Sequence, residues 1–225
     1  AYEIRNCDWS SDVCSSDLDW MAHWVVDRER SLAIAYDFGK KAVALDDTDG
    51  TAFSTLGMCH IYHRKYDDAE RCFDRALMLN PNDSIALAQY GFYLTAVGRI
   101  DEALVHFDES ARMNPLHVEW FNWLRGIALF TAHRYDEAIR VLKSIADPIN
   151  EVRGWLAVSY AGAGRLDEAR AMLEEFLRVA EEDMAVFPGR KLAAWEPFWH
   201  GAIEYQNDAD FEHLYDSLRK AGLED

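Results

Sequence analysis

The feature of this sequence that most constrains its fold is a repeat with a period of 34 residues. Similar residues recur at this spacing along the middle of the chain, and so many coincidences at one spacing are unexpected in an unrepeated sequence. The pairs are Gly57 and Gly91, Tyr66 and Ile100, Ala69 and Ala103, Phe73 and Phe107, Asn80 and Asn114, and Pro81 and Pro115. We therefore expect one small structural unit to occur several times, with each copy packed on the next.

A short turn motif recurs with the period, at residues 64–69, 98–103, 133–138 and 164–169. Apolar residues before and after each copy follow helical spacing. Paired acidic residues begin the second segment, where they complement a helix dipole. An Asn-Pro pair ends that segment in two of the units, because proline cannot continue a helix. Each unit is therefore predicted to be two helices joined by a tight turn.

This pattern resembles the tetratricopeptide repeat (TPR). Residues 50–83 carry the family pattern at Phe53, Leu56, Gly57, Tyr66, Ala69, Phe73, Ala76 and Pro81. The resemblance implies an all-α, right-handed superhelical solenoid of TPR helix-turn-helix units. We expect a degenerate first unit at 19–49, four further units at 50–83, 84–118, 119–149 and 150–180, and a linker with a C-terminal capping helix at 181–225. Pro188-Gly189 and Pro197 are expected to interrupt the helices of this last segment.

Residues 1–18 do not fit the rest of the chain. Residues 12–18 back-translate to GAC GTG TGC TCT TCC GAT CT, which resembles a short-read sequencing adapter. We therefore interpret residues 1–18 as an adapter-derived, non-native tail, and expect the natural protein to continue upstream of Asp19. The alternative is a genuine polar N-terminal tail.

Composition limits the classes of function. Half of the residues are hydrophobic, which is enough for a sizeable core. The net charge of -17 disfavours binding to nucleic acid, because acidic surfaces repel phosphates. No uninterrupted apolar run is long enough to predict a membrane span. Apart from the first 18 residues the chain has two cysteines, Cys59 and Cys72, so a cytoplasmic protein is expected rather than a disulfide-stabilised one.

The resemblance places one set of residues on the concave side of the solenoid. These peptide-groove candidates are apolar or aromatic, so an apolar or basic peptide is the expected ligand. The candidates are Met58, Ile61, Tyr62, Phe92, Trp120, Trp123, Ile127 and Phe130. The alternative is that the same residues pack within the protein, with the groove filled by residues 195–225, foremost Trp195, Phe198 and Trp199. The sequence leaves both possibilities open.

No catalytic, cofactor-binding or metal site is predicted, and we expect a non-enzyme. The Asp-Glu pairs recur with the unit and are interpreted as helix-start residues rather than acid–base pairs. Cys59, His60, His63 and Cys72 could in principle bind zinc, but Cys59 takes the small buried position of its unit. We interpret the group as a core thiol beside solvated imidazoles.

A second resemblance concerns function. Residues 114–128, 208–214 and 218–223 look like parts of the C-terminal TPR tails of bacterial class III adenylate/guanylate cyclases, and similar tails follow winged-helix transcription regulators. This implies an interaction or regulatory scaffold that is the C-terminal fragment of a larger bacterial signalling protein. It would contact a protein or peptide partner, or an upstream domain of its own parent. The alternatives are a stand-alone adaptor that binds a peptide in the groove, and the tail of a transcription regulator.

Overall fold

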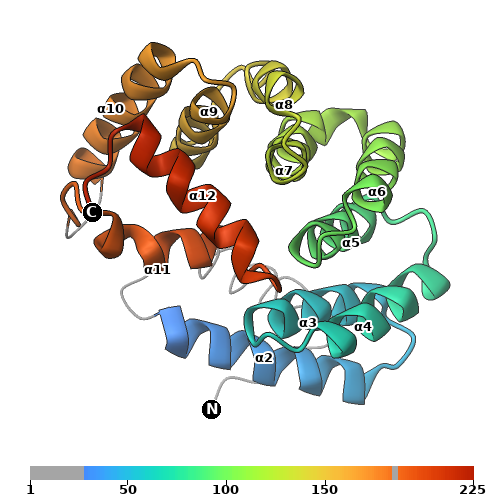
Figure 1. The fold of residues 1–225 in the computed structure, drawn as a ribbon. Helices are drawn as coiled ribbons and strands as arrows, with labels where there is room; N and C mark the ends of the chain where they lie inside the picture. Colours follow the sequence, from blue (N-terminus) through green and yellow to red (C-terminus); the bar gives the residue numbers. More distant parts are fainter. Residues whose placement is uncertain (1–27, 184–186) are drawn as a thin grey trace.

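The computed structural model describes residues 28–183 and 187–225, which include eleven α-helices, one short 3-10 helix and no strand. Of the described helices α2 comes first, and helices in antiparallel pairs follow it (Figure 1). This confirms the predicted all-α solenoid. The bounds are α2 (Arg28–Leu45), α3 (Gly50–Tyr62), α4 (Tyr66–Leu79), α5 (Ser84–Ala96), α6 (Ile100–Met113), η1 (Pro115–His117), α7 (Val118–Thr131), α8 (Tyr135–Leu142), α9 (Asn150–Gly162), α10 (Leu166–Asp183), α11 (Leu192–Ala202) and α12 (Asp208–Ala221).

The helices form two layers. The inner helices α3, α5, α7 and α9 contact one another in order, and each packs against its own outer partner, α4, α6, α8 or α10 (Figure 1). The inner helices α3, α5 and α9 are buried along nearly their whole length, whereas the outer helices bury one face. Asp49 and Asp83 cap α3 and α5 by accepting hydrogen bonds from the first free backbone amides.

The repeated Gly and Phe residues of the sequence contact each other within a unit. A Cβ atom added to Gly57 would lie 2.9 Å from the ring of Phe73, and one added to Gly91 would lie 2.8 Å from the ring of Phe107. Both rings are buried. Glycine is therefore required on the inner helix because the phenylalanine of the outer helix occupies the space of a side chain.

The turn inside each pair contains one residue in the left-handed region of backbone conformation. In the second and fourth pairs this residue is Gly98, with φ of 80°, and Gly164, with φ of 75°. In the other two pairs it is Arg64, with φ of 54°, and His133, with φ of 57°. A side chain in this conformation costs about 1 kcal/mol relative to glycine. Arg64 and His133 therefore occupy positions where glycine is the unstrained choice.

The C-terminal helices close the structure. Helix α12 lies across the middle of the curved row of helix pairs and contacts α9 and α10 (Figure 1). The prediction that Pro197 interrupts the chain is wrong, because this proline lies inside α11. Its ring removes one backbone hydrogen bond, but the buried rings of Trp195 and Trp199 on the same helix stabilise the helical conformation.

Candidate functional site

The eight groove candidates separate into two groups in the structure. Trp120 and Trp123, near the start of α7, are half-buried. The other six are buried, with at most 9% of the residue exposed: Met58, Ile61, Tyr62, Phe92, Ile127 and Phe130. Of the eight candidates, only the two tryptophans therefore offer solvent-exposed apolar surface to a partner.

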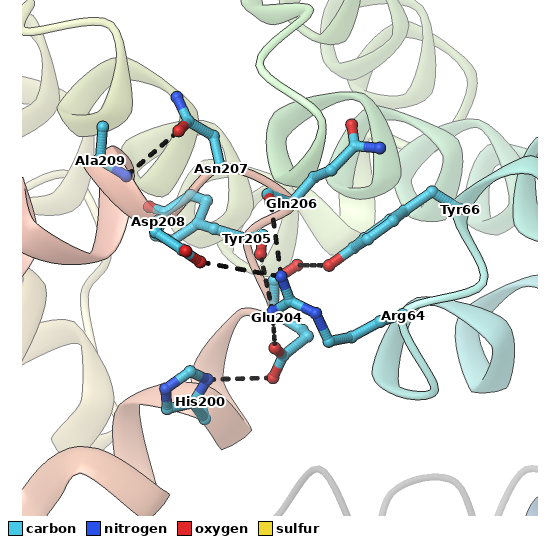
Figure 2. Close-up of polar contacts among 9 residues, drawn as sticks. All are labelled: Arg64, Tyr66, His200, Glu204, Tyr205, Gln206, Asn207, Asp208 and Ala209. Carbon is cyan, nitrogen blue, oxygen red and sulfur yellow. Dashed lines mark hydrogen bonds and ion pairs between the residues drawn. The ribbon is translucent and has the colours of Figure 1, made fainter.

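The C-terminal part of the chain covers the ends of the inner helices. Residues 203–207, which we call the crossing segment, join α11 to α12 (Figure 2). They contact residues at or just after the C-terminal ends of α3, α5 and α7. The amide of Gln206 donates to the carbonyl oxygen of Ala96 at 2.8 Å. The hydroxyl oxygens of Thr131 and Tyr205 are 2.7 Å apart, and the residue Tyr205 is fully buried. The crossing segment thus contacts three successive repeats.

Arg64 holds the crossing segment through several groups at once (Figure 2). Its guanidinium donates to a carboxylate oxygen of Glu204, and to the carbonyl oxygens of Tyr205 and Gln206 at 3.2 and 3.4 Å. The other carboxylate oxygen of Glu204 lies 3.1 Å from Nδ1 of His200. Because the Glu204 side chain is only 11% exposed, it needs these partners to offset the loss of water.

The hydroxyl of Tyr66, in the same turn, donates to the carbonyl oxygen of Glu204 at 3.4 Å. Burial raises the pKa of Tyr66 to about 12, so the hydroxyl keeps its proton at neutral pH. Arg64 and Tyr66 together therefore satisfy both the side chain and the backbone of Glu204.

The starts of the inner helices are less covered than their ends. Trp120 lies eleven residues before Thr131 on α7, and its ring contacts that of Phe121 at 5.4 Å between centroids. Ile85 at the start of α5 is 39% exposed, and Leu116, just before α7, is 93% exposed. Ile85, Leu116 and the two tryptophans thus leave exposed apolar side chains at the starts of α5 and α7.

The repeated acidic pairs behave as structural residues. Glu102 pairs with Arg99, Glu137 with Arg134, and Glu168 with Arg165, each three residues away. The hydrogen bond from arginine lowers the pKa of each of these glutamates. A general acid at neutral pH requires the opposite shift. In the described residues no group of three or more His, Cys, Asp and Glu side chains could hold a metal ion.

Sequence reasoning missed the residues that hold the C-terminal part of the chain: Arg64, His133, Glu204, Tyr205 and His213. One signal was available, since Arg64 and His133 stand where the equivalent turns have Gly98 and Gly164. No comparable signal marks Glu204 or Tyr205, because they lie outside the repeats.

Models of the tetratricopeptide repeat match residues 50–83, 93–151 and 150–175, which together are just over half of the chain. The chain belongs to the tetratricopeptide-repeat family. It is accordingly a protein–protein interaction scaffold of the kind that TPR solenoids form, and this fold is typically non-catalytic. Among the helices described, none is both long and apolar enough to cross a membrane.

Two curated relatives and one solved structure illustrate the range of similar TPR proteins. Superkiller protein 3 of Saccharomyces cerevisiae is 26% identical over 48% of this chain and 7% of its own length. The transcriptional regulator HilA of Salmonella typhimurium is 26% identical over 40% of this chain and 16% of its own length. The chain thus spans less than a fifth of either relative.

The solved structure is that of PilW, a widely conserved type IV pilus biogenesis factor. It is 19% identical, covers 92% of this chain and 90% of its own, and superposes with a TM-score of 0.64. At this level of identity the likeness concerns the fold alone.

Proposed function

We propose that this TPR scaffold is the C-terminal regulatory part of a larger bacterial signalling protein of the cyclase type. In this role it binds a protein partner or an upstream domain of its own parent protein. The resemblance of residues 114–128, 208–214 and 218–223 to cyclase tails supports the choice of parent.

We assign the binding of an apolar or basic peptide to the open apolar surface around Trp120 and Trp123. The observation that carries this assignment is the contrast among the eight candidates, of which only these two are partly exposed. Large aromatic side chains at partly open positions are the usual anchors of protein interfaces. The net charge of -17 favours a ligand with basic residues beside its apolar ones. A stand-alone adaptor would use the same surface.

A second candidate parent is a transcription regulator of the winged-helix class, with the repeats as its tail. The likeness to HilA, which is a transcriptional regulator, supports this alternative. In both cases the repeats themselves are the interaction part, and the activity of the parent belongs to another domain.

A panel of synthetic peptides tests the binding surface. We expect peptides that combine apolar and basic residues to bind the full chain better than acidic peptides of equal length. Trp123→Ala should weaken that binding by about 2 kcal/mol, because it removes an anchor side chain. Fluorescence anisotropy measures the affinity, and thermal unfolding of each variant shows whether the fold is intact.

Met78→Ala is the matched control, since Met78 is a 72% exposed apolar residue on the outer helix α4. It should leave the affinity unchanged. If Trp123→Ala lowers the melting temperature sharply while peptide affinity stays constant, Trp123 is a packing residue and the assignment fails.

Sequencing the source locus across codon 19 with long reads tests the parent. An upstream frame that encodes a cyclase supports the first proposal, and a winged helix supports the second. A reading frame that starts at residue 1 would exclude both and leave a stand-alone adaptor.

A further inference from the structure

A cluster of two histidines and a tyrosine joins α12 to the turn between α7 and α8. The hydroxyl of Tyr135 lies 2.6 Å from Nδ1 of His133 and 2.9 Å from Nε2 of His213. The two imidazole rings are 4.1 Å apart between centroids. The ring of His213 also stacks on Phe130, with centroids 4.5 Å apart and planes within 5° of parallel.

The hydrogen bonds of this cluster fit two neutral imidazoles. The tyrosine hydroxyl has one proton, so it can donate to one histidine nitrogen and accept from the other. The remaining nitrogen of His213, Nδ1, is buried without a hydrogen-bond partner. In the tautomer whose Nε2–H donates to Tyr135, Nδ1 carries no proton. A second proton on His213 would then place an N–H at Nδ1, where nothing accepts it, and a positive charge beside His133.

We propose that this cluster is a proton-sensitive contact, which holds α12 against the inner helices when the imidazoles are neutral and loosens it when His213 is protonated. The loosening would uncover Phe130, one of the buried groove residues. The inference concerns the C-terminal helix itself and goes beyond the proposed function, because it holds whichever partner the scaffold binds.

The charges around His213 agree with this direction. Burial, the main cause, together with His133 and Lys220, lowers the pKa of His213 to about 4, and Asp216 on the same helix opposes them. These are the charged groups that act on His213 within the described residues, and none of them comes from α9 or α10. A released His213 has the ordinary value of about 6.5. The docked state therefore binds fewer protons, and its advantage is lost as the pH falls from about 6.5 toward about 4.

Asp210 on α12 acts in the opposite direction. Burial raises the pKa of its carboxyl, so docking favours its protonated form at acidic pH. The effect of Asp210 sets in as the pH falls to the raised pKa of its docked carboxyl. The change in α12 protection between pH 7 and pH 5 is therefore the effect of His213 less any opposing effect of Asp210.

Other contacts of α12 set the size of the effect. Phe211, Leu214 and Leu218 are buried with at most 5% exposed, and they do not titrate. Their burial stabilises docking at every pH. Protonation therefore raises the population of a loosened helix rather than unfolding the protein.

Hydrogen exchange of the full chain tests the inference. The protection factors of α12 amides, corrected for the intrinsic pH dependence of exchange, should fall about tenfold relative to those of α9 between pH 7 and pH 5. In His213→Phe, which keeps the stacking on Phe130 and cannot be protonated, this relative fall should disappear. His213→Gln serves as a second non-titrating variant if the first does not fold.

His106→Phe is the matched control. His106 is also half-buried, its pKa is also lowered by burial, and its ring contacts Tyr90 on α5 at 4.9 Å, away from α12. This variant should keep the wild-type fall in α12 protection. The inference is overturned if wild-type α12 shows no relative fall, or if the fall persists in a folded variant at position 213.

Discussion

Two kinds of turn connect the inner and outer helices, and they differ in what they contact. Gly98 and Gly164 adopt the left-handed conformation without strain, and a Cβ atom added to either would meet nothing within 4 Å. Arg64 and His133 adopt the same conformation with a side chain. Arg64 holds Glu204, and His133 shares a tyrosine hydroxyl with His213. The strained turns are therefore the ones whose side chains hold the C-terminal part of the chain.

This difference shows how to interpret departures from a repeat. A turn with glycine makes no side-chain contact outside its own unit, so the same turn can occur in any unit. Replacing that glycine costs about 1 kcal/mol locally, so the side chain must contribute more than this elsewhere. In this protein the gain comes from contacts with residues outside the repeats.

The largest expected loss of stability comes from removing Tyr205, the buried side chain of the crossing segment. Tyr205→Ala should lower the free energy of unfolding by about 4 kcal/mol, because it deletes a fully buried aromatic side chain and leaves a cavity. Urea unfolding monitored by circular dichroism measures it. Tyr205→Phe, which loses only the hydrogen bond with Thr131, should cost about 1 kcal/mol. Equal losses in the two variants would show that the ring contributes little.

Substitutions of Arg64 are expected to cause an intermediate loss of stability, and the alanine variant should lose more than the glycine variant. Arg64→Ala should cost about 2 kcal/mol, because it leaves the Glu204 carboxylate without its cation while the backbone stays strained. Arg64→Gly loses the same contacts but relieves the strain, so it should be about 1 kcal/mol less destabilising. The same unfolding experiment ranks them. An alanine variant as stable as the glycine variant would contradict the strain at this turn.

The smallest expected effect is that of Gly98→Ala. The space around Gly98 is open, so the substitution tests backbone strain without a steric clash. We expect a loss of about 1 kcal/mol in the free energy of unfolding, with no change in the hydrogen exchange of α12. A substitution with no cost would mean that Arg64 and His133 need no compensating contact, and the comparison between the turns would lose its basis.

The repeats could be predicted from the sequence because their contacts are local and periodic. Gly57 and Phe73 are sixteen residues apart and touch, and Gly91 and Phe107 repeat the same contact 34 residues later. The 34-residue period is therefore enough to predict both the fold class and the close approach of the two helices in a unit. The prediction that Pro197 interrupts a helix is wrong because it considers local preference alone, which disfavours a proline inside a helix. The packing of Trp195 and Trp199 outweighs that preference.

Which residues of the inner helices are buried and which are exposed could not be predicted in the same way. Arg64 and Glu204 are 140 residues apart, and Tyr135 and His213 are 78 residues apart. Contacts between residues so far apart produce no periodic pattern in the sequence. Glu204 and His213 lie outside the repeats, so no second copy of them marks the contact. The sequence identified a set of apolar and aromatic residues, but the pattern of the repeat did not show which six are buried and which two are partly open.

The crossing segment also has a consequence for how the molecule unfolds. In an ordinary solenoid each repeat contacts only its neighbours, so the end repeats can fray while the middle remains folded. Here Gln206 bonds to Ala96, Tyr205 to Thr131 and Glu204 to Arg64, so one short stretch of backbone joins three repeats. Fraying of the earliest of these repeats must also break the bonds from Arg64 and Tyr66 to Glu204. We therefore expect a cooperative unit larger than one repeat, in which the three repeats that the crossing segment joins unfold together.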